Sequence, residues 1–306
     1  MTRTSLLRLI MLALMWGSSF LWIKIALDGL NPVQITLVRL ALGAAFLLAL
    51  CAASRLRLPS DRTVWAHMLL ISLIGNALPF VLFSIGEQTI DSGLAGVLNA
   101  TTPLWTALVA LLVGQERRPG PLRAAGLALG FAGTVLILAP WQGAGGTLRG
   151  ALACTIAAAL YGVTLVYTAR FLANRGVPPV VLATTQITMA TAWMLLATPF
   201  FGLQPVHLDP LVVMSVTVLG LFGTGYAFVL LHRLIADNGP TSASTVTYLM
   251  PVIAVLLGAV ALGESLGPRV LTGMVVVLAG VLLAQRKPRP AGAAAPVARP
   301  AVVGGE

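Results

Sequence analysis

Charged residues are scarce in this sequence. Of its 306 residues only 9% are Asp, Glu, Lys or Arg, whereas 58% are hydrophobic. A soluble domain carries about 25% charged residues to cover its surface. The deficit excludes a water-soluble globular protein and predicts a protein whose outer surface faces lipid. The formal net charge of +10 does not predict a nucleic-acid partner, because the basic residues lie in short loops between apolar runs.

Side chains that perform covalent chemistry or bind metals are also rare. The two cysteines, Cys51 and Cys154, lie inside apolar runs, so they predict neither a disulfide framework nor a metal site. The three histidines, His67, His207 and His232, are far apart in the sequence. There is no H-E-x-x-H motif and no P-loop. We therefore predict no metal and no cofactor, and we predict that the protein is neither an enzyme nor an ATP-driven pump.

Long apolar runs fill nearly the whole chain. Each is close to the roughly 20 residues that cross a bilayer as a helix, and backbone in hydrocarbon must satisfy its own hydrogen bonds. We predict an all-α membrane protein with ten transmembrane helices. Their approximate limits are 6–27, 33–53, 65–86, 92–113, 122–140, 150–171, 179–201, 210–232, 241–261 and 268–285. The first run resembles a signal peptide at its start, but its length predicts a retained helix.

The basic residues predict the orientation of these helices. If the N-terminus is cytoplasmic, 15 of the 19 Lys and Arg residues fall on the cytoplasmic side. This asymmetry follows the positive-inside rule. The exceptions are Lys24, Arg39, Arg149 and Arg269. We predict a multi-pass protein of a bacterial inner membrane with both termini in the cytoplasm.

The sequence contains an internal repeat at an offset of about 148 residues. Both halves contain a proline in an apolar run, then a glutamate, then Gly and Pro before the next run. Residues at matching offsets are Pro103 and Pro251, Glu116 and Glu264, Gly75 and Gly223, and Arg39 and Gln186. We predict a first five-helix repeat over 1–145, a second over 146–286 and a disordered cytoplasmic tail over 287–306. Because five is odd, the second repeat is inverted, an arrangement typical of secondary transporters.

Three phrases carry a resemblance to a known family. They are WGSSFLWIKIAL from Trp16, TPLWTALVALLVGQERRPGPLRAAGLALGFAGTVLI from Thr102, and MPVIAVLLGAVALGESLGPRVLTGMVVVLAGVLL from Met250. Together they resemble the drug/metabolite transporter superfamily in its ten-helix EamA-type branch. The resemblance implies two inverted repeats around a central cavity, with the fifth and tenth helices at the periphery. It also implies export of small metabolites, often amino acids, from bacteria.

Polar and aromatic residues at helical spacing predict the lining of this cavity. Asparagines that face lipid are unfavourable, so Asn76 and Asn99 should face protein or water. Single hydroxyls can instead hydrogen-bond between helices. The cavity candidates are Trp16, Ser19, Asn76, Pro79, Phe83, Asn99, Thr102, Tyr161, Thr224, Tyr226, Ser244 and Tyr248.

Two further sets of residues are candidates for moving parts. Pro103 and Pro251 each remove a backbone hydrogen bond in mid-membrane, so they are hinge candidates, or static kinks. Lys24 and Arg39 are charged gate candidates. Arg39 lies roughly 10 Å into the second helix, where it is either an interfacial anchor or an attractor for a carboxylate.

These features, together with the family resemblance, predict a transporter that exports small metabolites, in particular amino acids, by alternating access. The expected partners are a small-molecule substrate and the lipid bilayer, and the chain is expected to be a monomer or a weak homodimer. The alternative is a multidrug/proton antiporter for cationic compounds. The resemblance implies that four-helix multidrug members of the superfamily carry a membrane-embedded glutamate in their first helix, whereas the first helix here has no acid before Asp28.

Overall fold

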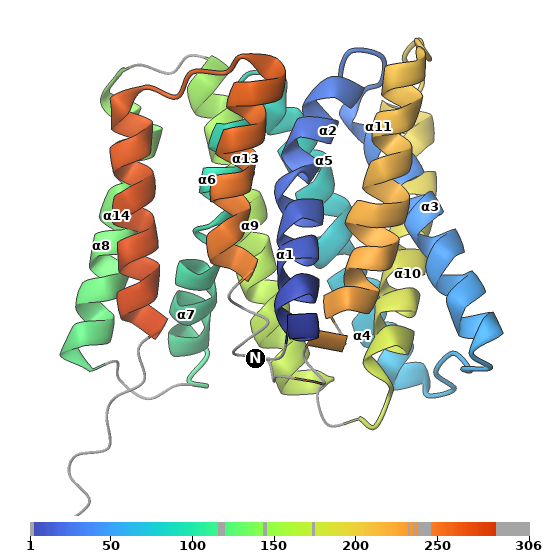
Figure 1. Ribbon diagram of the computed structural model, residues 1–306. Coiled ribbons are helices and arrows are strands. Elements are labelled where there is room, and N and C mark those ends of the chain that lie inside the picture. Colours follow the sequence, from blue (N-terminus) through green and yellow to red (C-terminus); the bar gives the residue numbers. More distant parts are fainter. Residues whose placement is uncertain are drawn as a thin grey trace, which may run out of the picture.

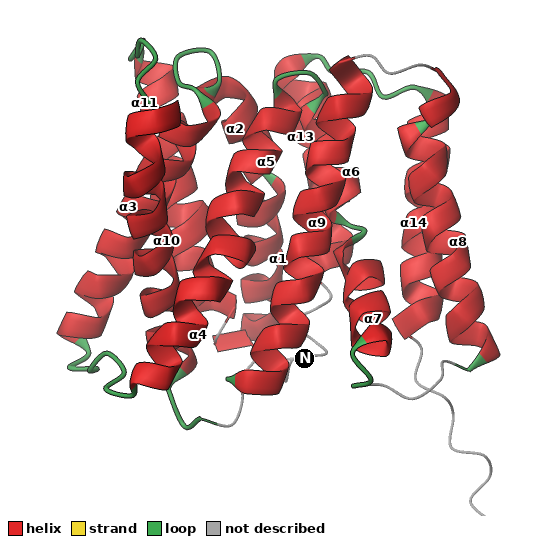
Figure 2. Ribbon diagram, turned by 180° about the vertical axis from the view of Figure 1, so that it is seen from behind, coloured by secondary structure: helices red, strands yellow, loops and turns green. Residues whose placement is uncertain are grey.

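The structure is a computed structural model, and it describes residues 3–115, 120–142, 146–172, 175–231, 233–234, 237 and 246–285. Every regular element in these residues is a helix (Figures 1 and 2). Nine helical segments of this described part are long and apolar enough to cross a membrane, and Val246–Leu262 is a shorter apolar helix. The predicted all-α membrane fold is confirmed. The predicted tail, 287–306, lies outside the described residues.

The helices follow one another in the same order in both halves of the chain. The first half contains α1 (Arg3–Gly17), α2 (Ser19–Ala26), α3 (Pro32–Ala53), α4 (Arg62–Ser72), a π-helical segment (Leu73–Ala77), α5 (Leu78–Glu87), α6 (Ser92–Asn99), α7 (Thr102–Leu112) and α8 (Pro121–Leu138). The second half contains α9 (Gly146–Phe171), α10 (Pro179–Phe201), α11 (Pro210–Gly220), a second π-helical segment (Leu221–Tyr226), α13 (Val246–Leu262) and α14 (Pro268–Gln285).

Local sequence accounts for where these helices begin. Proline is the first residue of α3, α8, α10, α11 and α14, a position where its missing N–H costs nothing. Asn31 caps α3 by accepting hydrogen bonds from the backbone of Val33 and Gln34. Asp61 and Asp209 cap α4 and α11 in the same way.

The two halves run in opposite directions. In Figure 1 α1 rises from the end of the bundle that carries the N-terminus, whereas α9, its counterpart, descends toward that end. We call this end the N-terminal end, and the end that holds the α2–α3 and α13–α14 connections the distal end. Residues 3 and 285 both lie at the N-terminal end (Figure 1). The predicted inverted two-repeat fold is confirmed, while boundaries at residues 145 and 286 stay a prediction.

Glycines bring the first helix of each repeat into close contact with the fourth helix of the other repeat. A side chain at Gly17 of α1 would lie 2.8 Å from the Ile253 side chain on α13. At Gly162 of α9 it would lie 2.8 Å from Cβ of Trp105 on α7. The first helix of each repeat therefore packs against the fourth helix of the other repeat. Close approach of this kind is typical of small residues in membrane helices.

The fifth and tenth helices, α8 and α14, pack on one another through glycines within the chain. Helix α8 packs on α14, away from the other helices in Figures 1 and 2. A Cβ at Gly133 would lie 2.9 Å from the Val277 nitrogen, and one at Gly126 would lie 2.9 Å from the Gly280 carbonyl oxygen. These glycine faces cover one another, so they act as scaffold for the two-repeat fold.

Candidate functional site

Two hydrogen bonds of the same kind join the repeats inside the bundle. Arg39 of α3 donates from Nε to the Thr224 hydroxyl at 3.0 Å. Gln186 of α10 donates from Nε2 to Oδ1 of Asn76 at 2.5 Å. Arg39 and Gln186 are repeat counterparts, and so are Asn76 and Thr224. We call these two interactions the crossed pairs, because each links the second helix of one repeat to a π segment of the other.

The π segments place the acceptors of the crossed pairs. The segments Leu73–Ala77 and Leu221–Tyr226 begin 148 residues apart, so the irregularity itself is repeated. A π turn adds a residue to the helix and disturbs its i→i−4 hydrogen bonds, and such turns are frequent at functional sites. Asn76 and Thr224 are both buried. A buried amide and a buried hydroxyl in mid-membrane therefore meet polar partners from the other repeat.

Arg39 is the only charged member of the crossed pairs. Its side chain is 6% exposed, and its guanidinium carbon lies 3.9 Å from the centre of the Phe80 ring. It therefore does not reach the membrane interface as an anchor. A buried guanidinium held by one hydroxyl and one aromatic face keeps further N–H groups that can bind a carboxylate.

Some of the predicted cavity residues lie close to Arg39. A Cβ at Gly223 would lie 3.0 Å from the Ser19 hydroxyl and 3.9 Å from Nη2 of Arg39, so both side chains meet the second π segment at the same point. Phe83 lies one turn after Phe80, which contacts Arg39, and its ring stacks on Tyr161 at 6.0 Å and meets the edge of Phe20 at 5.5 Å. Trp16 forms a separate edge-on pair with Phe228 at 6.4 Å.

The other cavity candidates are distributed along the bundle. Pro79 is buried at the start of α5. Tyr226 packs edge-on against Phe46 at 6.5 Å. Tyr248 donates a hydrogen bond to the Gln285 side chain at the end of α14, so it does not join the group around Arg39. Ser244 lies outside the described residues.

The fourth span is broken where the sequence predicts a hinge. Helix α6 ends at Asn99, and α7 begins at Thr102 with Pro103 as its second residue. Thr102 donates to the Asn99 carbonyl at 2.8 Å, and the Asn99 side-chain oxygen is buried without a hydrogen bond from the described residues. Pro251, the counterpart of Pro103, lies inside the continuous helix α13. Hinge motion at either proline stays a prediction.

Sequence reasoning missed one buried acid, Glu87. Glu87 is not among the predicted cavity residues, yet its side chain is 0% exposed. It ends α5, and Lys24 donates from Nζ to the backbone carbonyls of Glu87 and Ile90 at 2.6 and 2.8 Å. Tight packing of α5 on α9 causes the burial, since a Cβ at Gly86 would lie 2.8 Å from the Gly150 carbonyl oxygen.

Glu264 closes the distal end between the repeats. Its carboxylate accepts hydrogen bonds from the Ser92 nitrogen at 2.8 Å, the Ser92 hydroxyl at 3.0 Å and the Gly93 nitrogen at 3.0 Å. These donors belong to the first turn of α6, where a carboxylate is favoured. We call this contact the distal latch.

The segment Gly263–Gly267, which contains Glu264, reads G-E-S-L-G and so matches the G-x-S-x-G motif of hydrolases. In those enzymes the serine lies on a turn between a strand and a helix. Here the segment connects the two helices α13 and α14, so the match does not indicate a hydrolase nucleophile.

A polar cavity of about 510 Å³ lies beside the distal latch. Lys24, Asp28, Asp91 and Glu264 are its charged lining residues. Burial raises the pKa of the Asp91 carboxyl, and the nearby Glu264 raises it further while Lys24 opposes the change. The distal end therefore presents a mostly acidic pocket outside the crossed pairs.

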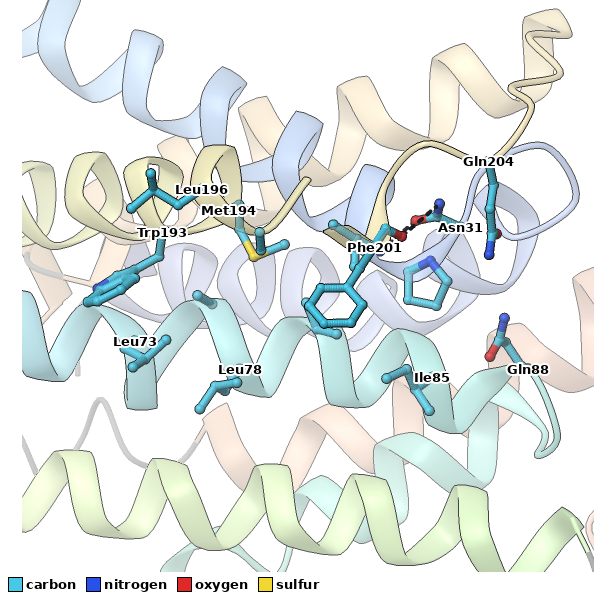
Figure 3. Close-up of a pocket in the computed structure, with 15 residues that line it drawn as sticks. Asn31, Leu73, Leu78, Ile85, Gln88, Trp193, Met194, Leu196, Phe201 and Gln204 are labelled. Carbon is cyan, nitrogen blue, oxygen red and sulfur yellow. Dashed lines mark hydrogen bonds between the residues drawn. The ribbon is translucent and has the colours of Figure 1, made fainter. Parts of the chain in front are cut away.

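A second cavity lies between α5 and α10, and Figure 3 shows its lining. Its volume is about 630 Å³. Leu73, Leu78 and Leu196 belong to its apolar walls, while the amides of Asn31, Gln88 and Gln204 gather toward one end. Asn31 Nδ2 lies 3.5 Å from the Phe201 carbonyl oxygen at that end. The cavity is therefore mostly apolar, with its polar groups at one end.

Comparison with known proteins places this architecture in a family. The model of the EamA-like transporter family matches the chain twice, at residues 3–139 and 148–285. The chain belongs to the EamA-like transporter family. This EamA protein is therefore a multi-pass membrane transporter, and its family and relatives indicate transport rather than enzymatic activity.

Relatives of this EamA protein align over most of its length. It is 28% identical over 270 residues to the uncharacterized transporter YdfC of Bacillus subtilis, covering 87% of this chain and 86% of the relative. It is 28% identical over 278 residues to the uncharacterized inner membrane transporter YedA of Escherichia coli K12, covering 89% and 87%. It is 27% identical over 286 residues to a probable terminal-alkyne amino-acid exporter of Streptantibioticus cattleyicolor, covering 91% and 92%.

A solved crystal structure shares the fold of this EamA protein. The two superpose with a TM-score of 0.66 at 22% identity, covering 92% of this chain and 97% of the other. The agreement extends over both repeats, so the whole bundle follows a known architecture.

Proposed function

We propose that this EamA protein exports neutral amino acids, or metabolites of similar size and charge, by alternating access of its two inverted halves. The observation that carries the proposal is the crossed pairs. Polar residues at equivalent positions of both repeats meet inside the bundle, where a substrate can be bound by both halves at once. Movement of one half against the other would then expose this centre to each membrane face in turn.

The chemistry around the crossed pairs favours a carboxylate with an apolar side chain. Arg39 offers planar N–H donors that match a carboxylate. Phe83 and Tyr161 offer apolar ring faces close by. The Streptantibioticus relative named as a probable amino-acid exporter supports the same substrate class.

Placement in a bacterial inner membrane with both termini in the cytoplasm is part of the proposal. The inner-membrane name of the Escherichia relative and the distribution of Lys and Arg residues support it. We further propose a monomer or weak homodimer, since the α8–α14 glycine faces are already used within one chain.

Multidrug/proton antiport is the second candidate function, and Glu87 favours it. An antiporter of that type needs a buried carboxylate that alternates between a proton and a cation. Glu87 is buried, although it lies in the third span and not in the first.

Counterflow in proteoliposomes tests the proposed function. Purified full-length protein is reconstituted in separate liposome batches that contain unlabelled L-leucine, L-phenylalanine, a nucleoside or a cationic dye, and each batch receives the same compound in labelled form outside at equal pH. We expect transient accumulation of the amino acids and none of the dye. Accumulation of the dye alone would support multidrug antiport, and a flux that saturates with none of these compounds would refute the amino-acid proposal.

A further inference from the structure

Glu87 is a buried carboxylate that neither the crossed pairs nor the distal latch uses. Its two carboxylate oxygens accept no hydrogen bond from any residue that the structure describes. An isolated ionised carboxylate is costly to bury, and a buried polar group without a partner calls for an explanation. A ligand that supplies a cation is one such explanation.

Two cations of the protein lie near Glu87 without pairing with its carboxylate. Lys24 and Arg39 both act on it electrostatically, and so does the distal Glu264. The Lys24 ammonium is directed to the backbone carbonyls of Glu87 and Ile90. Arg39 donates from Nε to Thr224 instead. Among the described residues, no cation therefore pairs with the buried Glu87 carboxylate.

Glu87 shares a helix face with the residues that surround Arg39. Phe80, Phe83 and Glu87 follow one another on α5 at intervals of three and four residues, so they line one side of the helix. Phe80 lies under the Arg39 guanidinium, and Glu87 lies two turns farther on, roughly 10 Å along the axis. An amino acid could bridge this distance. Its carboxylate would hydrogen-bond to Arg39 and its ammonium group to Glu87, each over about 2.8 Å, and its own backbone would cover the rest.

We propose that Glu87 binds the ammonium group of a zwitterionic substrate whose carboxylate is held by Arg39. The inference rests on the proposed amino-acid transport and narrows it to amino acids with a free α-amine. The dipole of such a substrate points from Arg39 to Glu87, and its side chain meets Phe83 and Tyr161. A substrate with a blocked amine would satisfy Arg39 and leave Glu87 unpaired.

The test compares three ligands that share the leucine side chain: L-leucine is a zwitterion, N-acetyl-L-leucine lacks the ammonium group, and L-leucinamide lacks the carboxylate. Counterflow competition against labelled L-leucine is measured for L-leucine, N-acetyl-L-leucine and L-leucinamide with the full-length protein in liposomes at equal pH. We expect both derivatives to compete at least tenfold more weakly than L-leucine. Equal competition by N-acetyl-L-leucine in the wild-type protein would overturn the inference without any variant being needed.

Variants at Glu87 then locate the ammonium site. We expect Glu87→Gln to weaken L-leucine competition at least tenfold while competition by N-acetyl-L-leucine stays within twofold. Glu87→Asp should recover part of the loss. Asp28→Asn is the matched control, because Asp28 is an exposed acid at the distal end, and it should stay within twofold of wild type.

The outcomes separate the inference from the proposed function. If the wild-type protein exchanges no amino acid, the proposed function fails. If it exchanges L-leucine and Glu87→Gln keeps the wild-type affinity for it, only the inference fails. If Glu87→Gln keeps that affinity but loses uptake driven by a pH gradient, Glu87 carries a proton and the ammonium assignment is wrong.

Discussion

Arg39 and Gln186 occupy equivalent positions of a duplicated helix but differ in charge. Both donate to the π segment of the other repeat, so the duplication preserved the interaction while one copy kept a cation. A guanidinium binds a carboxylate more strongly than a neutral amide does. The proposed substrate site is therefore asymmetric, whereas the fold around it is symmetric.

The hydrogen bond from Arg39 to Thr224 should contribute to stability as well as transport. Thr224→Val keeps the shape of the side chain but removes the acceptor, and a hydrogen bond to a charged group contributes about 1.5–3 kcal/mol. We expect a loss of that size in the free energy of unfolding, measured in mixed micelles. Thr224→Ser keeps the hydroxyl and should retain the hydrogen bond. Equal stability of wild type and Thr224→Val would show that the bond is not formed.

Asp61 should make stability depend on pH at the N-terminal end. It accepts from the Thr63 nitrogen at 2.8 Å and from Arg175 at 3.1 Å. The hydrogen bonds from Thr63, and then the Arg175 charge, lower the pKa of its carboxyl. A lowered pKa in the folded state gives stability above the unfolded pKa of about 3.9, and this stability is lost as pH falls through the folded value.

Thermal unfolding in detergent between pH 7 and pH 3 checks this dependence. Asp61→Asn should unfold at a lower temperature than wild type at pH 7, and the difference should shrink toward pH 3. A difference that stays constant across this range would contradict the assigned role of the Asp61 carboxylate.

At the scale of helices, contacts between the first and fourth helices of opposite repeats depend on single glycines. Gly162→Ala would place a methyl group 2.8 Å from the Thr106 nitrogen and from the Trp105 side chain. Overpacking of this kind costs about 1–3 kcal/mol. We expect Gly162→Ala to lower the free energy of unfolding by that amount and to slow exchange.

Gly267→Ala is the control for this prediction. An added Cβ at Gly267 meets nothing within 4 Å, so the variant should unfold and exchange like wild type. If both variants behaved like wild type, the α7–α9 contact would be looser than the structure indicates.

The order and inversion of the helices could be predicted from sequence because hydropathy and the repeat offset depend on local pattern. The π segments could not, since Asn76 and Thr224 look like ordinary polar residues in apolar runs. Glu87 was missed because it ends an apolar run near Asp91, where an acid usually marks a turn. Only the packing of Gly86 on α9 reveals its burial. The direction of Tyr248, toward α14, likewise depends on tertiary contacts.

At the scale of the whole molecule, polar contacts join the two packed repeats at both ends and in the middle. The distal latch joins Glu264 to Ser92 and Gly93, the crossed pairs join the repeats inside the bundle, and an ion pair between Arg8 and Asp237 joins them at the N-terminal end. Alternating access requires contacts at one end to break while those at the other end form or persist. In the proposed mechanism, the crossed pairs lie between these two sets of end contacts and persist while either end opens.

Spin-label distances at the two ends, measured with and without L-leucine in one membrane preparation, test this account most directly. One pair of labels replaces Thr89 and Ser265, which are exposed at the distal end, and the other replaces Gln115 and Arg233, exposed at the N-terminal end. The account predicts that L-leucine shifts the two distance distributions in opposite directions, one pair lengthening as the other shortens. Distances that stay unchanged, or that change together, in protein that exchanges L-leucine would contradict alternating access by two rocking halves.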